Sequence, residues 1–137
     1  MFRIIFCVFL LCSQYFAKEN FMIIAQLNEE KFNITLENNK ASAEFLTQLP
    51  LELSFSDYVH KEKIAHLEKP LSIKHTNGYA PKIGDFFYYS PWGNIGIFYE
   101  KQSPASGLVY LGKVDKKLVE KLKNTNSDFK LKIYELK

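Results

Sequence analysis

The chain has 137 residues, of which 47% are hydrophobic and 24% are charged. This composition indicates a globular domain and excludes a disordered, collagen-like or coiled-coil chain. The formal net charge of +3 lacks the strong basic excess of nucleic-acid-binding domains, so we expect no nucleic-acid partner.

Residues 1–17 have the layout of a secretory signal peptide. Arg3 provides the positive charge, an apolar run covers residues 4–11, and Ala17 is the small residue at the expected cleavage site. The run is shorter than the roughly 20 residues that span a bilayer. We therefore expect cleavage near Ala17 and no stable membrane span afterwards. A lipoprotein signal at Cys12 and an uncleaved N-terminal anchor are the alternatives.

The remaining residues, 18–137, are expected to form one exported domain. Both cysteines, Cys7 and Cys12, lie in the leader, so the mature chain has neither a disulfide nor a reactive thiol. The only arginine, Arg3, is lost with them. Export without disulfides suits a periplasmic or extracellular protein that is stabilised by its hydrophobic core.

The first half of this domain predicts a hairpin, a helix and a strand. Phe21–Leu27 is apolar, and Phe32–Leu36 alternates apolar and polar residues after a polar turn, which is typical of paired strands. A helix is predicted over Asn39–Leu49, and Pro50 ends it because proline lacks an amide donor. Leu51–Phe55 alternates again and predicts a half-buried strand.

The centre of the chain contains a polar stretch and then strongly apolar strands. Residues 57–76 are mixed in character, and we interpret them as irregular, with a short strand near Leu71 as an option. Phe86–Tyr89 and Ile95–Tyr99 are apolar on both faces and flank a turn. Strands of this kind belong in the middle of a covered sheet or barrel.

The last third predicts a strand at Leu108–Val114, a helix at Asp115–Lys123 and a strand at Phe129–Ile133. Asp115 is the expected N-cap of the helix. The strands follow one another at hairpin spacing rather than in βαβ units. The sequence therefore predicts a mainly β fold, a small closed antiparallel β-barrel with two short helices, and we expect a monomer.

Several short motifs resemble the bacterial cyclophilin-like domain family. They occur in the family's order between Phe21 and Leu136, and the resemblance implies a cyclophilin-type barrel capped by two helices. The family is named for its fold, so no activity follows from the name. The motifs are Leu49-Pro50-Leu51, Ser56-Asp57-Tyr58, Glu62-Lys63, Gly84-Asp85-Phe86, Tyr88-Tyr89, Gly96-Ile97-Phe98-Tyr99 and Leu111-Gly112-Lys113-Val114.

Peptidyl-prolyl isomerisation is the activity that a resemblance to cyclophilins raises as a hypothesis. True cyclophilins lower the rotation barrier, roughly 18–20 kcal/mol, with an arginine that donates to the amide as its resonance is lost. The mature chain contains no arginine, and lysine lacks the planar fork of donors. We therefore expect at most a weak isomerase and favour a non-catalytic protein.

The histidines and the acidic residues do not form a metal or nucleophile signature. His60 and His66 are six residues apart rather than the four of a helical ligand pair, and no cysteine is left to complete a zinc set. The chain also lacks G-x-S-x-G, P-loop and G-x-G-x-x-G motifs. We expect no metal, no cofactor and no catalytic residue.

Aromatic residues give the most informative candidate site. Most of them are expected in the core, but alternation along strands directs some outward. Tyrosine and tryptophan at a barrel mouth are suited to a peptide or small-molecule ligand. Glu62 and Lys63 are either a binding pair at its rim or a solvated turn. The candidate ligand-binding residues are Tyr58, Glu62, Tyr88, Trp92 and Phe98.

The predicted function is that of an exported, non-catalytic barrel that binds a peptide or a small molecule. The alternatives are a weak prolyl isomerase and a structural or interaction module of the cell envelope.

Overall fold

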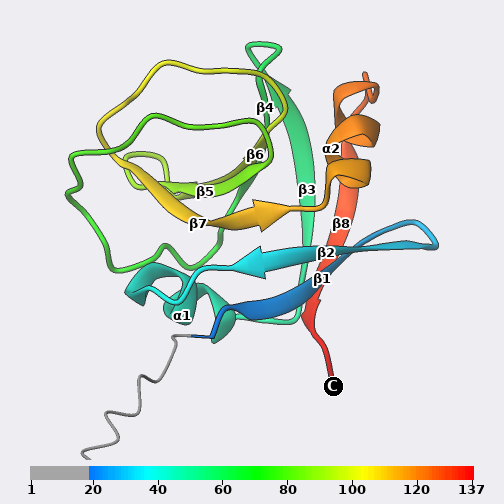
Figure 1. Cartoon of the computed structure of the whole chain (residues 1–137), viewed down its shortest axis with the longest axis horizontal. Coiled ribbons are helices and arrows are strands. Elements are labelled where there is room, and N and C mark those ends of the chain that lie inside the picture. The colour runs from blue at the N-terminus through cyan, green and yellow to red at the C-terminus, as the bar shows by residue number, and fades with distance from the viewer. Residues whose placement is uncertain (1–18) are drawn as a thin grey trace, which may run out of the picture.

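Eight antiparallel strands close into one barrel in the computed structural model, which describes residues 19–137 (Figure 1). The leader predicted at residues 1–17 lies outside the described residues. The order of strands around the barrel is β1-β2-β7-β5-β6-β4-β3-β8. The predicted fold class is therefore confirmed. The elements are β1 (Phe21–Leu27), β2 (Glu30–Leu36), α1 (Lys40–Leu46), β3 (Leu51–Tyr58), β4 (Glu62–His66), β5 (Asp85–Tyr89), β6 (Asn94–Phe98), β7 (Leu108–Val114), α2 (Lys116–Lys123) and β8 (Phe129–Glu135).

The interpretation of residues 57–76 as irregular was wrong in part. Strand β4 lies within this stretch and pairs with both β3 and β6. It begins with two charged residues, Glu62 and Lys63, which are both buried. A strand that buries charged side chains does not show the apolar alternation by which a strand is predicted. Leu71 lies in the connection between β4 and β5, outside the strands of the described chain.

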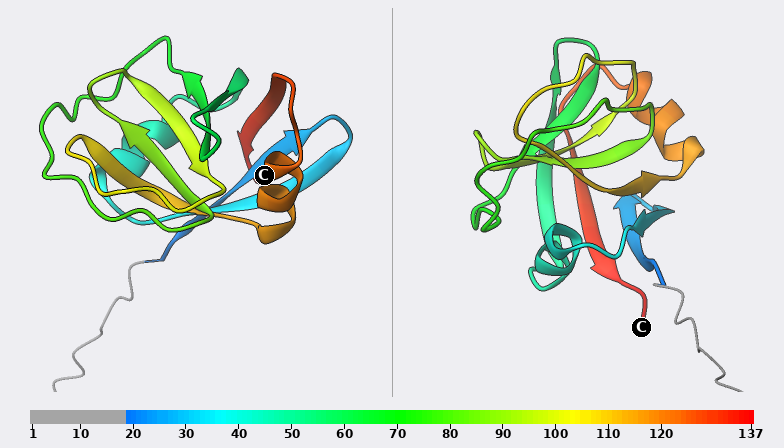
Figure 2. Two further views of the ribbon diagram at one scale, coloured as in Figure 1. Left: turned by 90° about the horizontal axis from the view of Figure 1, so that it is seen from above. Right: turned by 60° about the vertical axis from the view of Figure 1, so that its left-hand side comes forward.

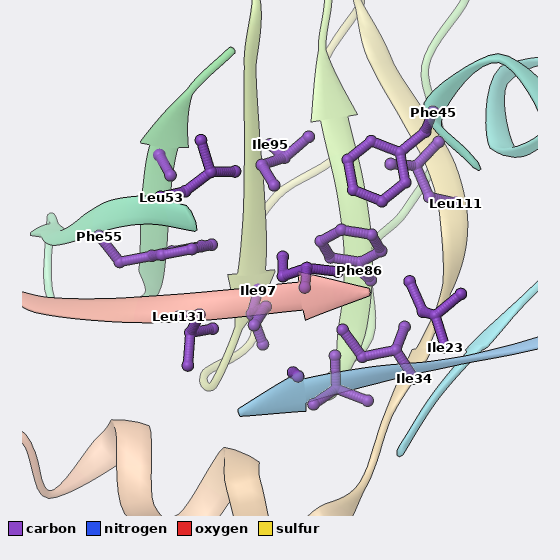
Figure 3. Packing of buried hydrophobic residues seen from close by; sticks show 14 of the residues in the cluster. Ile23, Ile34, Phe45, Leu53, Phe55, Phe86, Ile95, Ile97, Leu111 and Leu131 are labelled. Atoms are coloured by element: carbon purple, nitrogen blue, oxygen red, sulfur yellow. The ribbon is translucent and has the colours of Figure 1, made fainter. Parts of the chain in front are cut away.

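The interior of the barrel is filled by one apolar core (Figure 3). Side chains from all eight strands alternate into it, as in other small barrels. The two helices cover opposite sides of this core in Figure 3. Helix α1 contributes Phe45, whose ring meets that of Phe86 edge to face with centroids 5.4 Å apart. Helix α2 contributes Leu118 and Leu122, which are both fully buried.

A second, smaller apolar cluster lies on the outer face of the barrel. Phe87 and Phe98 alternate with the core residues Phe86 and Ile97, so their side chains point outward. Their rings stack with centroids 4.2 Å apart, and Leu108 from β7 completes the cluster. We call these three residues the outer cluster. The prediction that β5 and β6 are apolar on both faces is confirmed.

Two long connections, residues 67–84 and 99–107, cover the outer cluster. The connection 67–84 lies on the side of the barrel away from α2 in Figure 1, and the views in Figure 2 agree. The connection 99–107 begins next to α2, where Glu100 forms a salt bridge with Lys123, and ends on that same side. The connections are joined by a bridge between Tyr79 and Ala105 and by the Gly107 amide, which donates to the Thr76 carbonyl at 3.2 Å. Tyr79 packs against the outer cluster. The two connections therefore shield from water an apolar surface that would otherwise be exposed.

Gly96 on β6 leaves room for the Phe87 ring of the neighbouring strand to approach its backbone. A Cβ atom on Gly96 would stand 2.3 Å from Cζ of Phe87 and 2.9 Å from the carbonyl oxygen of Lys63. Both distances are far below van der Waals contact. The close approach of strand and ring therefore requires glycine at this position.

We expect the substitution G96A to lower the free energy of unfolding by about 1–3 kcal/mol, because the Phe87 ring must leave its place. The measurement is urea unfolding of G96A, F87L and the double variant. Leucine lacks the far ring atoms, so G96A should cost less in the F87L background. An equal loss in both backgrounds would show that the ring is not the obstacle.

Candidate functional site

A concavity of about 250 Å³ opens beside the outer cluster. It is formed by the β3–β4 hairpin, the turn after β5, strand β6 and the connection 99–107. Its residues are Tyr58, Glu62, Tyr89, Trp92, Phe98, Gln102, Ser103, Pro104, Ala105 and Leu108. Four of the five candidate residues predicted from the sequence line it.

The β3–β4 hairpin places Tyr58 and Glu62 opposite each other in the ladder. The turn between them holds Val59 and His60 at positive φ, 49° and 55°, which is strained for a β-branched residue such as valine. The Asp57 carboxylate accepts a hydrogen bond from the His60 amide at 3.0 Å and supports the turn. On its other side, Glu62 pairs with Phe98 of β6. The three residues thus lie side by side across three strands.

Three aromatic rings form one corner of the concavity. Trp92 lies in the turn after β5 and is half exposed. Its ring stands nearly perpendicular to that of Tyr58, at 85° with centroids 5.2 Å apart. It stands at 87° to the ring of Tyr89, with centroids 5.0 Å apart. Edge-to-face contacts of this kind fix the relative orientation of the rings.

Tyr88 does not line the concavity. It is buried in the main core, and its hydroxyl accepts a hydrogen bond from the Leu71 amide at 3.1 Å. Tyr88 and Tyr89 face opposite sides, as successive residues of a strand do, and Tyr89 is the residue that points outward. Tyr88 points inward because it stands two residues after Phe86, whose side chain is also part of the main core.

Glu62 is the buried acid of the site, with 8% of its surface exposed. Burial raises the pKa of its carboxyl to about 7, the nearby Gln102 side chain lowers it, and the negative charge of Asp57 raises it. Among residues 19–137, no lysine or histidine forms a salt bridge with Glu62. Near neutral pH the Glu62 carboxyl is therefore present in both its ionised and its protonated form.

Lys63, the next residue, has a different environment. Its ammonium group lies 3.0 Å from Asp57 and donates to the Thr125 carbonyl at 2.6 Å. Tyr99 also donates to Asp57. Burial alone would raise the pKa of Asp57, but these two hydrogen bonds, together with that from His60, hold it below its usual range. Glu62 and Lys63 thus form neither a solvated turn nor a pair.

The remaining lining residues were not predicted. Gln102, Ser103, Pro104 and Ala105 belong to the connection 99–107, which the sequence marks as a Ser/Pro/Gly loop without indicating where it packs. The predicted residues were expected at a barrel mouth, whereas the concavity that four of them line lies on the outer face, beside the outer cluster. Helices α1 and α2 both pack against the main core.

Two other concavities on the described part of the chain are wider and include no buried acid. One of about 500 Å³ is lined by Leu49, Pro50 and residues 134–137, and another of about 540 Å³ lies against α2 and β7. A third, of about 280 Å³, includes the buried Asp85, whose carboxylate is paired with Lys113. In residues 19–137, no group of three or more histidine, cysteine or acidic side chains is placed to hold a metal ion. His60, His66 and His75 are all exposed.

Comparison with known proteins identifies the family. The model of the Cyclophilin-like family matches residues 25–134. The chain belongs to this family. A solved structure with the same fold is the solution structure of the hypothetical protein AF2241 from Archaeoglobus fulgidus, with a TM-score of 0.66 and 13% sequence identity over 89% of this chain and 99% of that chain. No curated protein matches the chain.

The family membership confirms the resemblance seen in the sequence, and the shared structure supports the fold alone. The solved structure is that of a protein described as hypothetical, and this description names no ligand. Within residues 19–137, no helix is both long enough and apolar enough to cross a bilayer. The residues of the concavity are therefore the basis for a functional hypothesis for this Cyclophilin-like chain.

We expect E62Q to make the protein more stable at pH 8 and to change it little at pH 4. The folded-state pKa of Glu62 is about 7 and its ordinary value is 4.5. Between these values the folded state binds more protons than the unfolded state, so stability falls as pH rises. One pKa unit corresponds to about 1.4 kcal/mol, and solvent in the concavity reduces the effect, so we expect a gain of about 2 kcal/mol at pH 8.

Urea unfolding at pH 4, 6 and 8 measures this gain. E100Q is the matched control, because Glu100 is only partly buried and its carboxylate has its pKa lowered by Lys123. A gain for E62Q that is the same at all three pH values would show that ionisation of Glu62 is not its cause.

Proposed function

We propose that this protein is an exported, monomeric, non-catalytic binding protein whose site for a small molecule or a peptide side chain is the outer-face concavity. The observation that carries the proposal is the joining of three aromatic rings to a buried acid, Glu62, in one concavity. Apolar walls with a few polar anchors are the usual composition of a ligand site. The volume of about 250 Å³ suits a small group.

A non-catalytic role is favoured over prolyl isomerisation by the donors present. Residues 19–137 contain no arginine, and the concavity is lined by no lysine. The Glu62 carboxyl is either neutral or negative, so it cannot supply the fixed positive charge that stabilises a twisting amide. Electrostatic stabilisation of the kind used by true cyclophilins is therefore not provided by the residues that line this site.

Trp92 emission tests the binding role directly, because it is the only tryptophan and it lines the site. We expect its emission to change saturably with at least one member of a panel of blocked amino-acid amides and small alcohols and amines. L136A, at an exposed residue of another concavity, should bind equally well. W92A, followed by amide NMR shifts, should lose most of the affinity.

A protease-free isomerisation assay on a proline tetrapeptide is the companion measurement. We expect the uncatalysed rate at micromolar protein. Rate acceleration that disappears in W92A but not in L136A would overturn the non-catalytic assignment in favour of a weak isomerase. If no panel member changes Trp92 emission or amide shifts, the binding assignment fails and a structural role in the envelope becomes the better account.

Export is the second part of the proposal, and it rests on Arg3, the apolar run at residues 4–11 and Ala17. N-terminal sequencing of the native protein should begin near Lys18. A cytoplasmic protein that keeps Met1 would contradict export.

A further inference from the structure

Two acidic residues are buried among residues 19–137, Asp85 and Glu62, and only Asp85 has a cationic partner, Lys113. The more exposed Asp57 is also paired, with Lys63. Asp85 also accepts hydrogen bonds from Tyr79 and from the Lys82 amide. Glu62 is the most interesting exception, since among residues 19–137 it has no cationic partner. A buried carboxylate without a cation is costly when ionised.

The cations nearest to Glu62 in the chain are engaged elsewhere. The ammonium group of Lys63 is held by Asp57 and the Thr125 carbonyl. That of Lys61 donates to the Lys101 carbonyl at 3.0 Å. A positive charge that reaches the Glu62 carboxylate through the concavity therefore meets no competing ammonium group among the residues that line it.

The aromatic walls favour the same kind of ligand. Tyr58 and Tyr89 stand nearly perpendicular to Trp92 on the same concavity. Rings at right angles present π-electron density from more than one direction to a group placed in the corner. Tryptophan and tyrosine attract organic cations through their ring quadrupoles, by about 0.5–2 kcal/mol for each contact. Methylated and alkylated ammonium groups fit such corners because they are both charged and apolar on their surface.

We propose that the concavity binds an alkylammonium group, with the Glu62 carboxylate as its counter-ion and the rings of Trp92, Tyr58 and Tyr89 as its walls. This inference rests on the proposed function and names the ligand chemistry of the same site. The group has two sources, a free amine of choline size or the side chain of a lysine in a peptide. The concavity of about 250 Å³ admits the head group in both cases.

Binding should depend on pH through Glu62. An ammonium group favours the ionised carboxylate, so affinity should be high above the pKa of about 7 and fall below it. From pH 8 to pH 5.5 the ionised fraction falls about 30-fold. The other charged or titratable groups around Glu62 come from β3, the turn, β4 and the segment after β6, and they are Asp57, Tyr58, His60, Lys61, Lys63, Tyr99, Glu100 and Lys101. Of these side-chain types, only histidine ordinarily titrates between pH 5 and 8, so H60N is required as a control.

The experiment is a titration of Trp92 emission at pH 8 with choline and with its neutral isostere 3,3-dimethylbutan-1-ol. We expect choline to bind at least about 10-fold more tightly, since ion pairing and cation–π contacts are absent for the alcohol. E62Q should lose about 10-fold in choline affinity and should keep its weak affinity for the alcohol. E100Q and H60N should match the wild type within two-fold, and only E62Q should lose the decrease at pH 5.5.

The second arm compares choline with Nα-acetyl-lysine amide and its trimethylated form. Tighter binding of either blocked lysine indicates a peptide ligand, and tighter binding of choline indicates a free amine; both support the alkylammonium assignment. Equal affinity for choline and the neutral alcohol, or full choline affinity in E62Q with native circular dichroism, would overturn it. If only neutral compounds bind, the binding function survives without this ligand class, whereas a failure of all compounds removes both.

Discussion

Strands β5 and β6 bury side chains on both of their faces, and this double burial is the constraint on which the rest of the structure depends. The inner face contributes Phe86, Tyr88, Ile95 and Ile97 to the main core. The outer face carries Phe87 and Phe98, which need a second cover because exposed apolar area on this scale is unfavourable in water. The chain supplies that cover with residues 67–84 and 99–107. The concavity opens at the margin of the cover, beside the aromatic corner.

This arrangement explains why a buried acid is found on the outside of a barrel. Glu62 lies next to Phe98 in the ladder, at the margin of the outer cluster, so it loses water when the connection 99–107 packs over the sheet. Its neighbour Lys63 points the other way and is neutralised by Asp57. Because successive residues of a strand face opposite sides, the two charges of Glu62-Lys63 are separated into two different environments. The raised pKa of Glu62 and the lowered pKa of Asp57 are the results of this separation.

Much of the barrel could be predicted from sequence because its local signals agree. The hairpin of β1 and β2, the limits of β7 and the N-cap of α2 at Asp115 follow from alternation and capping. Strand β4 could not be predicted in this way, since Glu62 and Lys63 are buried by tertiary contacts that leave no trace in local hydrophobicity. The same limit applies to the prediction of the site residues, since local sequence does not show tertiary contacts. Tyr58, Glu62, Trp92 and Phe98 were predicted as site residues, whereas the choice of Tyr88 over Tyr89 required knowledge of which face of β5 looks inward. Gln102 was missed because loop composition does not show where a loop packs.

The proposals for the concavity depend on the protonation of the Glu62 carboxyl. The connection 99–107 buries this carboxyl, burial raises its pKa, and the ionised form is the one that an ammonium group would bind. The most direct measurement is a carboxyl carbon-13 NMR titration of the full chain, with Glu62 assigned by its absence from E62Q. A titration midpoint near pH 7, shifted downward by saturating choline, agrees with the account. A midpoint near the ordinary value of 4.5, unchanged by choline, would contradict it, since Glu62 would then be fully ionised without any partner.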